Sequence, residues 1–274
     1  RWRSLFDARF DVLLYDLTST YFECDPPEHG KRQFGYSRDK RSDCVQIVIA
    51  LVLTTEGFPL AYKVLPGNTL DNQTLRDFLA DIEKQYGKAK RLWLMDRGIP
   101  TEEVLAEMRA SDPPASYLVG TPKGRLTKYE ERLLKENWQQ AREGVNVKLL
   151  TDEGETYVLA RSEDRVHKER SMRRRRLKRY LKALHKLRLQ RKLPLTRDDL
   201  LKALGGAAKE AGRAAKHIVI TLPPEGTAVT PESFHYRDDR SRLRQPRRRE
   251  GRHLLRTTLA STDPAQLWER YLHL

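Results

Sequence analysis

Two aspartates are associated with apolar segments that have the pattern of β-strands. Asp16 is inside "LLYDLTST", and Asp96 directly follows the apolar stretch "RLWLM". A carboxylate beside an apolar strand is costly unless it is hydrogen-bonded, paired with a cation or bound to a metal. Taken singly, each has an ordinary alternative: Asp16 could bond to Thr18 or a nearby amide, and Asp96 could cap a helix or form a turn. Their chemical interest therefore depends on whether the two lie together.

The expected strand order does bring the two acids together. The strand that contains Asp16 neighbours the strand that Asp96 follows, so both acids are expected at one end of the sheet. Neighbouring carboxylates repel each other unless a cation lies between them, and hard oxygen ligands select Mg²⁺ or Mn²⁺. Two such ions about 4 Å apart can activate an attacking oxygen and stabilise a leaving one. The pair thus indicates cleavage or transfer at a phosphodiester.

The segments that carry these acids alternate between strand and helix patterns. Runs rich in β-branched and aromatic residues predict five strands, at 12–22, 44–54, 60–65, 91–95 and 115–119. Apolar stripes at helical spacing over 75–86, ended by Gly87, and over 104–108 predict the helices between them. We therefore expect an α/β fold, a mixed sheet with helices on both faces. This is also the element order of a ribonuclease H-like fold.

The composition changes after residue 120. A hairpin pattern is followed by a long basic helix, a strand, and an arginine-rich segment at 237–252 that reads as a loop. We expect a catalytic core at 9–120, a basic α+β insertion at 121–250, and a return strand with the start of a final helix at 251–274. The apolar stripe of the basic helix consists of Leu177, Tyr180, Leu181, Leu184 and Leu187.

The charge of the chain favours a polyanionic partner. Lysine and arginine number 53 against 38 acidic residues, a net charge of +15. Within 161–192, 15 basic and 3 acidic residues give a net charge of +12. Such a run can be the solvated face of a helix, but it repels itself unless a polyanion is near. We expect phosphate contacts from one cluster: Arg173, Arg174, Arg175, Arg176, Lys178 and Arg179.

Cysteine content and hydropathy indicate a cytoplasmic protein. Cys24 and Cys44 are too few for a disulfide framework. With His29 they could form a zinc site, but neither C-x-x-C nor H-x-x-x-H spacing supports one. The longest apolar stretch, 45–53, is far shorter than the roughly 20 residues of a membrane-spanning helix. We therefore expect no membrane contact.

The chain ends in "DPAQLWERYLHL", which has the pattern of a helix. Asp263 can cap its first turn, and Pro264 suits the first helical position. Leu267, Tyr271 and Leu274 fall on one face at helical spacing. No Gly, Asn or Pro ends the pattern, so we expect the helix to continue beyond Leu274.

Three stretches, in this order, resemble DDE transposases of the insertion-sequence-four type: "YDLTSTYFE", "GYSRDKRSDCVQIVIALVLTTEGFPLAYKVLPGNTLDNQTL" and "LWLMDRGIPTEEVL". The similarity is close over residues 11 to about 120 and looser from there to "DPAQLWERY". It implies a ribonuclease H-like catalytic core with an insertion, in which Asp16 and Asp96 are the first two acids of a two-metal Mg²⁺ or Mn²⁺ site. The implied reaction is hydrolysis at the ends of a bacterial mobile element, followed by attack of the freed 3′-hydroxyl on target DNA.

The resemblance also implies partners and supporting residues. Double-stranded DNA, as element ends and target, is the expected partner in the bacterial nucleoid. Joining two ends implies a homodimer in a synaptic complex. Thr18 would orient Asp16, and Arg97 would contact a phosphate. Trp138 is a candidate for stacking on a displaced base, but we favour a place for it in the core of an amphipathic helix.

The third acid of the family is a glutamate that follows a tyrosine in the pattern Tyr-x2-Arg-x3-Glu-x6-Lys. Tyr271 corresponds to that tyrosine, Leu274 stands at the arginine position, and the glutamate would come about four residues later. Within the chain, Glu23, Asp43 and Glu269 are better explained as surface or positioning residues. We therefore expect the 274-residue chain by itself to cleave DNA little or not at all.

Two other functions stay open on the sequence. One is a non-catalytic, DNA-binding remnant of a transposase, which would bind DNA without cleavage even in a longer chain. The other is a host ribonuclease or resolvase on the same fold, which would act on RNA–DNA hybrids or branched DNA.

Overall fold

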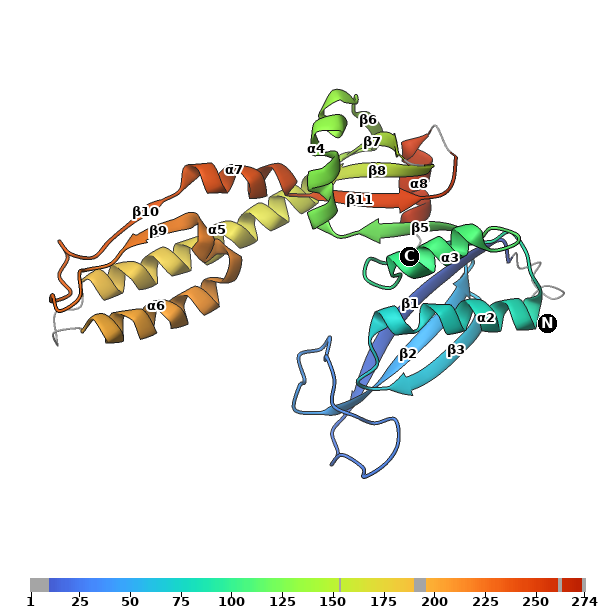
Figure 1. Cartoon of the computed structure of the whole chain (residues 1–274), viewed down its shortest axis with the longest axis horizontal. Coiled ribbons are helices and arrows are strands. Elements are labelled where there is room, and N and C mark those ends of the chain that lie inside the picture. The colour runs from blue at the N-terminus through green and yellow to red at the C-terminus, as the bar shows by residue number, and fades with distance from the viewer. Residues whose placement is uncertain (1–9, 153, 190–195, 261–262, 273–274) are drawn as a thin grey trace. The chain divides into compact units, whose positions relative to one another are not determined.

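The computed structural model describes residues 10–152, 154–189, 196–260 and 263–272. The chain divides into two compact units, Arg1–Ala160 with His253–Leu274, and Arg161–Arg252 (Figure 1). The first unit contains both aspartates, and the second contains the basic cluster.

The first unit is built on a nine-stranded mixed sheet of order β3-β2-β1-β4-β5-β11-β8-β7-β6 (Figure 1). β1 is parallel to β4, and β4 to β5, whereas β1–β2, β2–β3, β5–β11 and β6–β7 are antiparallel. The strands are β1 (Val12–Phe22), β2 (Val45–Thr54), β3 (Pro59–Pro66), β4 (Leu92–Met95), β5 (Ser116–Thr121), β6 (Gln139–Arg142), β7 (Val145–Asp152), β8 (Glu155–Ser162) and β11 (Arg252–Thr257). The five strands predicted before residue 120 are confirmed.

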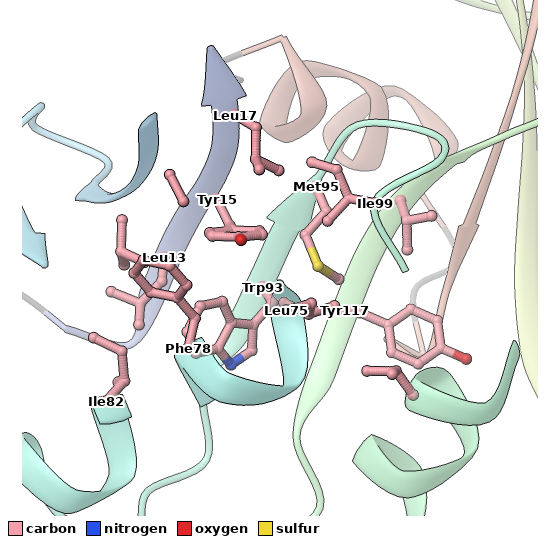
Figure 2. Close-up of a cluster of buried hydrophobic side chains, with 14 of the residues drawn as sticks. Leu13, Tyr15, Leu17, Leu75, Phe78, Ile82, Trp93, Met95, Ile99 and Tyr117 are labelled. Carbon is pink, nitrogen blue, oxygen red and sulfur yellow. The ribbon is translucent and has the colours of Figure 1, made fainter. Parts of the chain in front are cut away.

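Alternation along β1 explains how the sheet is held. Leu13, Tyr15 and Leu17 are fully buried and point to one face, because successive side chains of a strand point to opposite faces. On that face they belong to the cluster that contains the apolar stripe of α2 (Leu75–Tyr86) and the buried residues of α3 (Glu102–Ala110). Figure 2 shows Leu13 and Tyr15 beside Phe78 of α2. The core face therefore fixes the register of the strand, while the other face carries the buried Leu14 and then the exposed Asp16 and Thr18.

The opposite face is covered in part by α8 (Pro264–Tyr271), whose Leu267 and Trp268 pack in a cluster with Leu94 and Leu118. The cap predicted at its start is confirmed. The carboxylate of Asp263 accepts hydrogen bonds from the backbone amides of Ala265, at 2.9 Å, and Gln266, at 3.4 Å. Helices thus lie on both faces of the sheet, as expected. A further helix, α4 (Leu126–Lys135), packs on the later strands.

The described part of the second unit contains three α-helices and an antiparallel pair of strands: α5 (Glu163–Arg188), α6 (Arg197–Ala211), β9 (Ile218–Thr221), β10 (His235–Asp238) and α7 (Arg240–Arg249). The predicted stripe of α5 is confirmed, because Tyr180 and Leu184 lie in the core of this unit with the three other leucines packed against it. In the described part of the chain no helix is both long and apolar enough to cross a membrane.

The arginine-rich segment at 237–252 is mostly helical, so its interpretation as a loop was wrong. The carboxylate of Asp239 caps α7 by accepting hydrogen bonds from the backbone amides of Ser241 and Arg242. Leu243 is buried at 5% exposure and anchors the helix to the unit. The cap and the buried Leu243 thus both stabilise this arginine-rich segment as a helix.

The structure divides the chain at a different residue from the sequence-based division. The insertion was expected to start at residue 121, but β6, β7 and β8 complete the nine-stranded sheet and the second unit starts at Arg161. Val158 and Ala160 of β8 pack in the same cluster as Leu255 and Leu267. A hairpin pattern shows that two strands pair, but not which sheet they join.

Candidate functional site

Asp16 and Asp96 occupy adjacent positions on neighbouring parallel strands. The last paired residues of β1 and β4 are Tyr15 and Met95, and the two aspartates come one step later. Because neighbouring strands lie about 5 Å apart, the two carboxylates project side by side, Asp16 from the middle of β1 and Asp96 from the residue directly after β4. Both residues are exposed. The structure therefore places Asp16 and Asp96 next to each other, as the sequence analysis expected.

Each carboxylate is oriented by the backbone that follows it. Asp16 Oδ1 accepts a hydrogen bond from the Leu17 amide at 2.8 Å, and Asp96 Oδ1 accepts one from the Arg97 amide at 2.7 Å. Neither Oδ2 atom has a hydrogen-bond partner recorded among the described residues. One oxygen of each acid is thus fixed, and the other is open to a cation.

The surroundings of Asp16 disfavour its charged form. Neighbouring protein atoms keep part of the solvent away from the carboxylate and raise its pKa, and the negative charges of Asp96 and Asp71 act in the same direction. The Leu17 hydrogen bond and the positive charge of Arg38 oppose this rise. A bound cation would relieve the repulsion between the two acids.

Tyr271 of α8 contacts Asp96 on the face of the sheet that α8 covers. Its hydroxyl donates a hydrogen bond to Asp96 Oδ1 at 3.0 Å, so the same oxygen takes two donors. Gly120 of β5 makes this approach possible, because a Cβ there would lie 2.7 Å from the Tyr271 hydroxyl and 3.2 Å from the Arg97 amide. The sequence analysis missed Gly120, for which the one signal is a glycine inside a strand-like segment.

Arg38 is a second residue that the sequence analysis missed. Its guanidinium donates to the carbonyl of Leu17 and lies 3.1 Å from Asp71 Oδ2. It therefore fixes the backbone next to Asp16 and places a positive charge nearby. Its signal was present in "GYSRDKRSD", a polar stretch between two strands, but nothing in that pattern shows where the side chain points.

The other predicted residues of this unit differ in what they contact. Thr18 is exposed on the same face of β1 as Asp16, but the described structure records no hydrogen bond between them. The Arg97 side chain is exposed next to the pair. Trp138 lies after the end of α4, is 39% exposed and has Lys148 Nζ 4.6 Å from its ring centre. The favoured interpretation of Trp138, as a residue in the core of an amphipathic helix, is therefore wrong.

Other acids and the cysteines do not extend the pair. Glu23 and Asp43 both hold the Arg41 guanidinium, at 2.6 and 2.9 Å, and Glu269 is exposed on α8. Across the described ranges, no three histidine, cysteine, aspartate or glutamate side chains gather as a metal-binding group. The glutamate expected about four residues after Leu274 lies outside the sequence.

Five of the six predicted phosphate-binding residues on α5 are exposed: Arg174, Arg175, Arg176, Lys178 and Arg179. Arg173 differs, since its side chain is only 13% exposed and its Nε donates to Glu250 Oε1 at 2.6 Å. The Glu250 side chain is itself 5% exposed. This side of α5 thus holds the unit together, while the rest presents positive charge to solvent.

Comparison with known proteins gives one family match that spans nearly the whole chain. A family model described as "Transposase DDE domain" matches residues 11–271. A cryo-EM structure of a piggyBac transposase synaptic complex with hairpin DNA is similar at 13% sequence identity and a TM-score of 0.38, over 56% of this chain and 31% of that one. This chain therefore spans less than a third of that protein. No curated protein matches.

Proposed function

Because the chain belongs to the transposase DDE domain family, we propose that it takes part in DNA transposition through the carboxylates of Asp16 and Asp96. The reaction is phosphodiester hydrolysis at the ends of an insertion sequence of the insertion-sequence-four type. The freed 3′-hydroxyl then attacks a phosphodiester of the target DNA, which joins the element to the target and releases a target 3′-hydroxyl. The observation that carries the proposal is the placement of two oriented carboxylates one register step beyond Tyr15 and Met95.

The donor set fits Mg²⁺ or Mn²⁺. Both ligands are hard carboxylate oxygens, each with its Oδ1 fixed by an amide and its Oδ2 open. When bound, the metal would polarise the scissile phosphate and lower the pKa of the attacking hydroxyl or water. Asp16 and Asp96 would hold the ions, and Tyr271 would keep Asp96 in place through its 3.0 Å hydrogen bond. Arg97 would contact a phosphate oxygen beside the pair.

The second unit would bind duplex DNA through the exposed side chains of α5. Their role is to neutralise phosphates, which gives affinity and strong salt dependence without sequence preference. Arg173, which is held by Glu250, would contribute to the stability of the unit. The joining of two element ends would need two copies of the protein, as in a homodimeric synaptic complex.

The number of carboxylates favours a second candidate, a non-catalytic DNA-binding remnant. The described residues bring two acids together, and in-line transfer on two metals needs a more complete set of ligands. Two carboxylates alone would bind one ion weakly. On either candidate we expect this chain by itself to show metal and DNA binding with little cleavage.

Manganese binding tests the role of the carboxylate pair. Titration of the chain with Mn²⁺, followed by electron paramagnetic resonance, should give a site that Asp16→Asn or Asp96→Asn abolishes. Asp11→Asn is the matched control, because Asp11 is an exposed aspartate directly before β1, five residues from Asp16, and should leave binding unchanged. Equal Mn²⁺ binding by the wild type and both site variants would refute the proposed site.

Cleavage separates the two candidates. Labelled duplex DNA that carries the ends of the element would be incubated with Mg²⁺ or Mn²⁺. Activity in a longer version of the chain, lost with Asp96→Asn, would identify an active transposase. Metal-independent binding without cleavage by that longer version would identify the remnant.

A further inference from the structure

The connection between β1 and β2 contains a segment, 31–41, that is both basic and aromatic. Its sequence "KRQFGYSRDKR" has five basic residues against one acid. Two rings are exposed on it, Phe34 at 51% and Tyr36 at 87%. Figure 1 shows the connection as loops that extend from the ends of β1 and β2. Exposed rings among basic side chains are the composition of surfaces that bind unpaired nucleic acid strands.

The backbone that carries these rings is fixed on the sheet. Gln33 and Gln46 exchange both backbone hydrogen bonds at 3.0 Å. The side chain of Gln46, a residue only 2% exposed, donates to the carbonyls of Tyr36 at 3.1 Å and Gly67 at 2.8 Å. Gly35 packs so closely that a Cβ there would lie 2.0 Å from the Gly67 carbonyl oxygen. The backbone of the segment is thus held in place by hydrogen bonds and close packing, while the rings of Phe34 and Tyr36 are exposed to solvent.

Lys40 adds strain at the tip of the same segment. It has φ of 63° and is, within the ranges that the structure describes, the one non-glycine residue with positive φ. The turn is closed by hydrogen bonds to Ser37, from the Lys40 amide to its carbonyl at 3.3 Å and from the Arg41 amide to its hydroxyl at 3.0 Å. A long side chain is disfavoured in this conformation, and such outliers are concentrated at binding sites.

Arg38 connects the segment to the carboxylate pair. It follows Tyr36 by two residues, and its guanidinium donates to the carbonyl of Leu17, the residue after Asp16. A DNA strand on the pair would therefore pass next to the segment.

We propose that residues 31–41 bind the DNA strand that flanks the scissile phosphate, with Phe34 and Tyr36 stacked on unpaired bases and Lys40 against a phosphate. The inference rests on the proposed function, because DNA must first be the substrate at Asp16 and Asp96. It assigns a further part of the protein to strand binding, in the first unit and separate from the basic face of α5. The ligand class is a locally unpaired DNA strand.

Fluorescence anisotropy with two labelled DNAs tests the inference on the full chain. One DNA is a paired duplex, and the other has the same length and charge but a short unpaired stretch. We expect the wild type to bind the second more tightly. Loss of one stacked base corresponds to roughly 5- to 150-fold in affinity, so Tyr36→Ala and Phe34→Ala should each weaken binding of the unpaired DNA by about tenfold. Binding of the paired duplex should change little.

Two control variants separate stacking from folding. Tyr36→Phe keeps the ring and should keep the affinity. Lys40→Gly removes a charge and relieves the positive φ, so it should raise the melting temperature while it weakens DNA binding and lowers the salt slope by about one. A purely structural role for Lys40 would not make stability and binding change in opposite directions.

The outcomes distinguish this inference from the function on which it rests. If the wild type binds neither DNA, the proposed function fails together with the inference. If the wild type binds both and the alanine variants bind equally well, only the inference is overturned. If those variants instead change the sedimentation of the free protein and leave DNA binding intact, the rings pack against a second copy and the inference is overturned.

Discussion

Replacing Arg173 with alanine separates two roles that an arginine on α5 can have. Arg173 and Arg174 are adjacent and belong to the same basic run. Arg173 is 13% exposed and bonded to the buried Glu250, whereas Arg174 is exposed. We expect Arg173→Ala to reduce stability with little effect on DNA binding, and Arg174→Ala to do the reverse.

The size of the stability loss follows from what remains around Glu250. Removing one partner of a buried ion pair costs about 3–5 kcal/mol, because a buried charge loses its compensation. Arg170 Nε lies 3.5 Å from Glu250 Oε2, with its side chain 42% exposed, so part of the compensation stays. We therefore expect the free energy of unfolding to fall by about 3 kcal/mol, at the lower end of that range.

Urea unfolding followed by circular dichroism measures the first effect, and DNA affinity over a series of salt concentrations measures the second. Arg174→Ala should change the free energy of unfolding by less than about 0.5 kcal/mol, as for most surface positions. It should lower the slope of log affinity against log salt by about one, whereas Arg173→Ala should not. The double variant Arg173→Met with Glu250→Leu should recover much of the lost stability, because it leaves no buried charge.

The reasoning would be refuted if Arg173→Ala unfolded at the same urea concentration as the wild type. It would also be refuted if the salt slope fell as much for Arg173→Ala as for Arg174→Ala. Either result would mean that the contact with Glu250 is not what holds Arg173.

Three further predictions concern single residues. Gly120→Ala places a Cβ 2.7 Å from the Tyr271 hydroxyl and should weaken Mn²⁺ binding about fivefold, the equivalent of one lost hydrogen bond of about 1 kcal/mol. Burial lowers the pKa of His217, so the unfolded chain binds a proton that the folded unit excludes; stability should fall as the pH drops below about 6.5, and His217→Gln should flatten this dependence in urea unfolding. Arg256→Met removes the buried partner of Glu155, which lies 2.6 Å from the Arg256 Nε and is 6% exposed. Because Arg109 stays 3.0 Å from Glu155, the loss in the same assay should be about 3 kcal/mol, the lower end of the range for such pairs.

Each of these has a control or a contrary result. Gly124→Ala is the match for Gly120→Ala, because a Cβ at Gly124 meets open space, and equal Mn²⁺ affinity in both variants would contradict the role of Gly120. A variant of His217 that keeps the full pH dependence would show that another group causes it. Wild-type stability of Arg256→Met would mean that Glu155 is compensated by Arg109, which lies 3.0 Å away.

Local patterns in the sequence determined the elements and the candidate acids. The alternation of Leu13, Tyr15 and Leu17 identifies a strand with one buried face, and the stripe around Tyr180 and Leu184 identifies the helix that carries the basic cluster. These predictions hold because periodicity depends on residues a few positions apart.

Tertiary packing alone decided which distant residues meet. The Tyr271 hydroxyl reaches Asp96 across 175 positions of sequence, and Arg173 meets Glu250 across 77. The strands β6 to β8 join the main sheet, and apolar residues of β7 and β8 pack in one cluster with Leu255 and Leu267. A hairpin pattern cannot specify which sheet the hairpin joins. The types and spacing of residues therefore determined which groups could do chemistry. Long-range packing decided which of these groups are oriented, paired or free to bind DNA. Those contacts depend on backbone positions that no local pattern encodes.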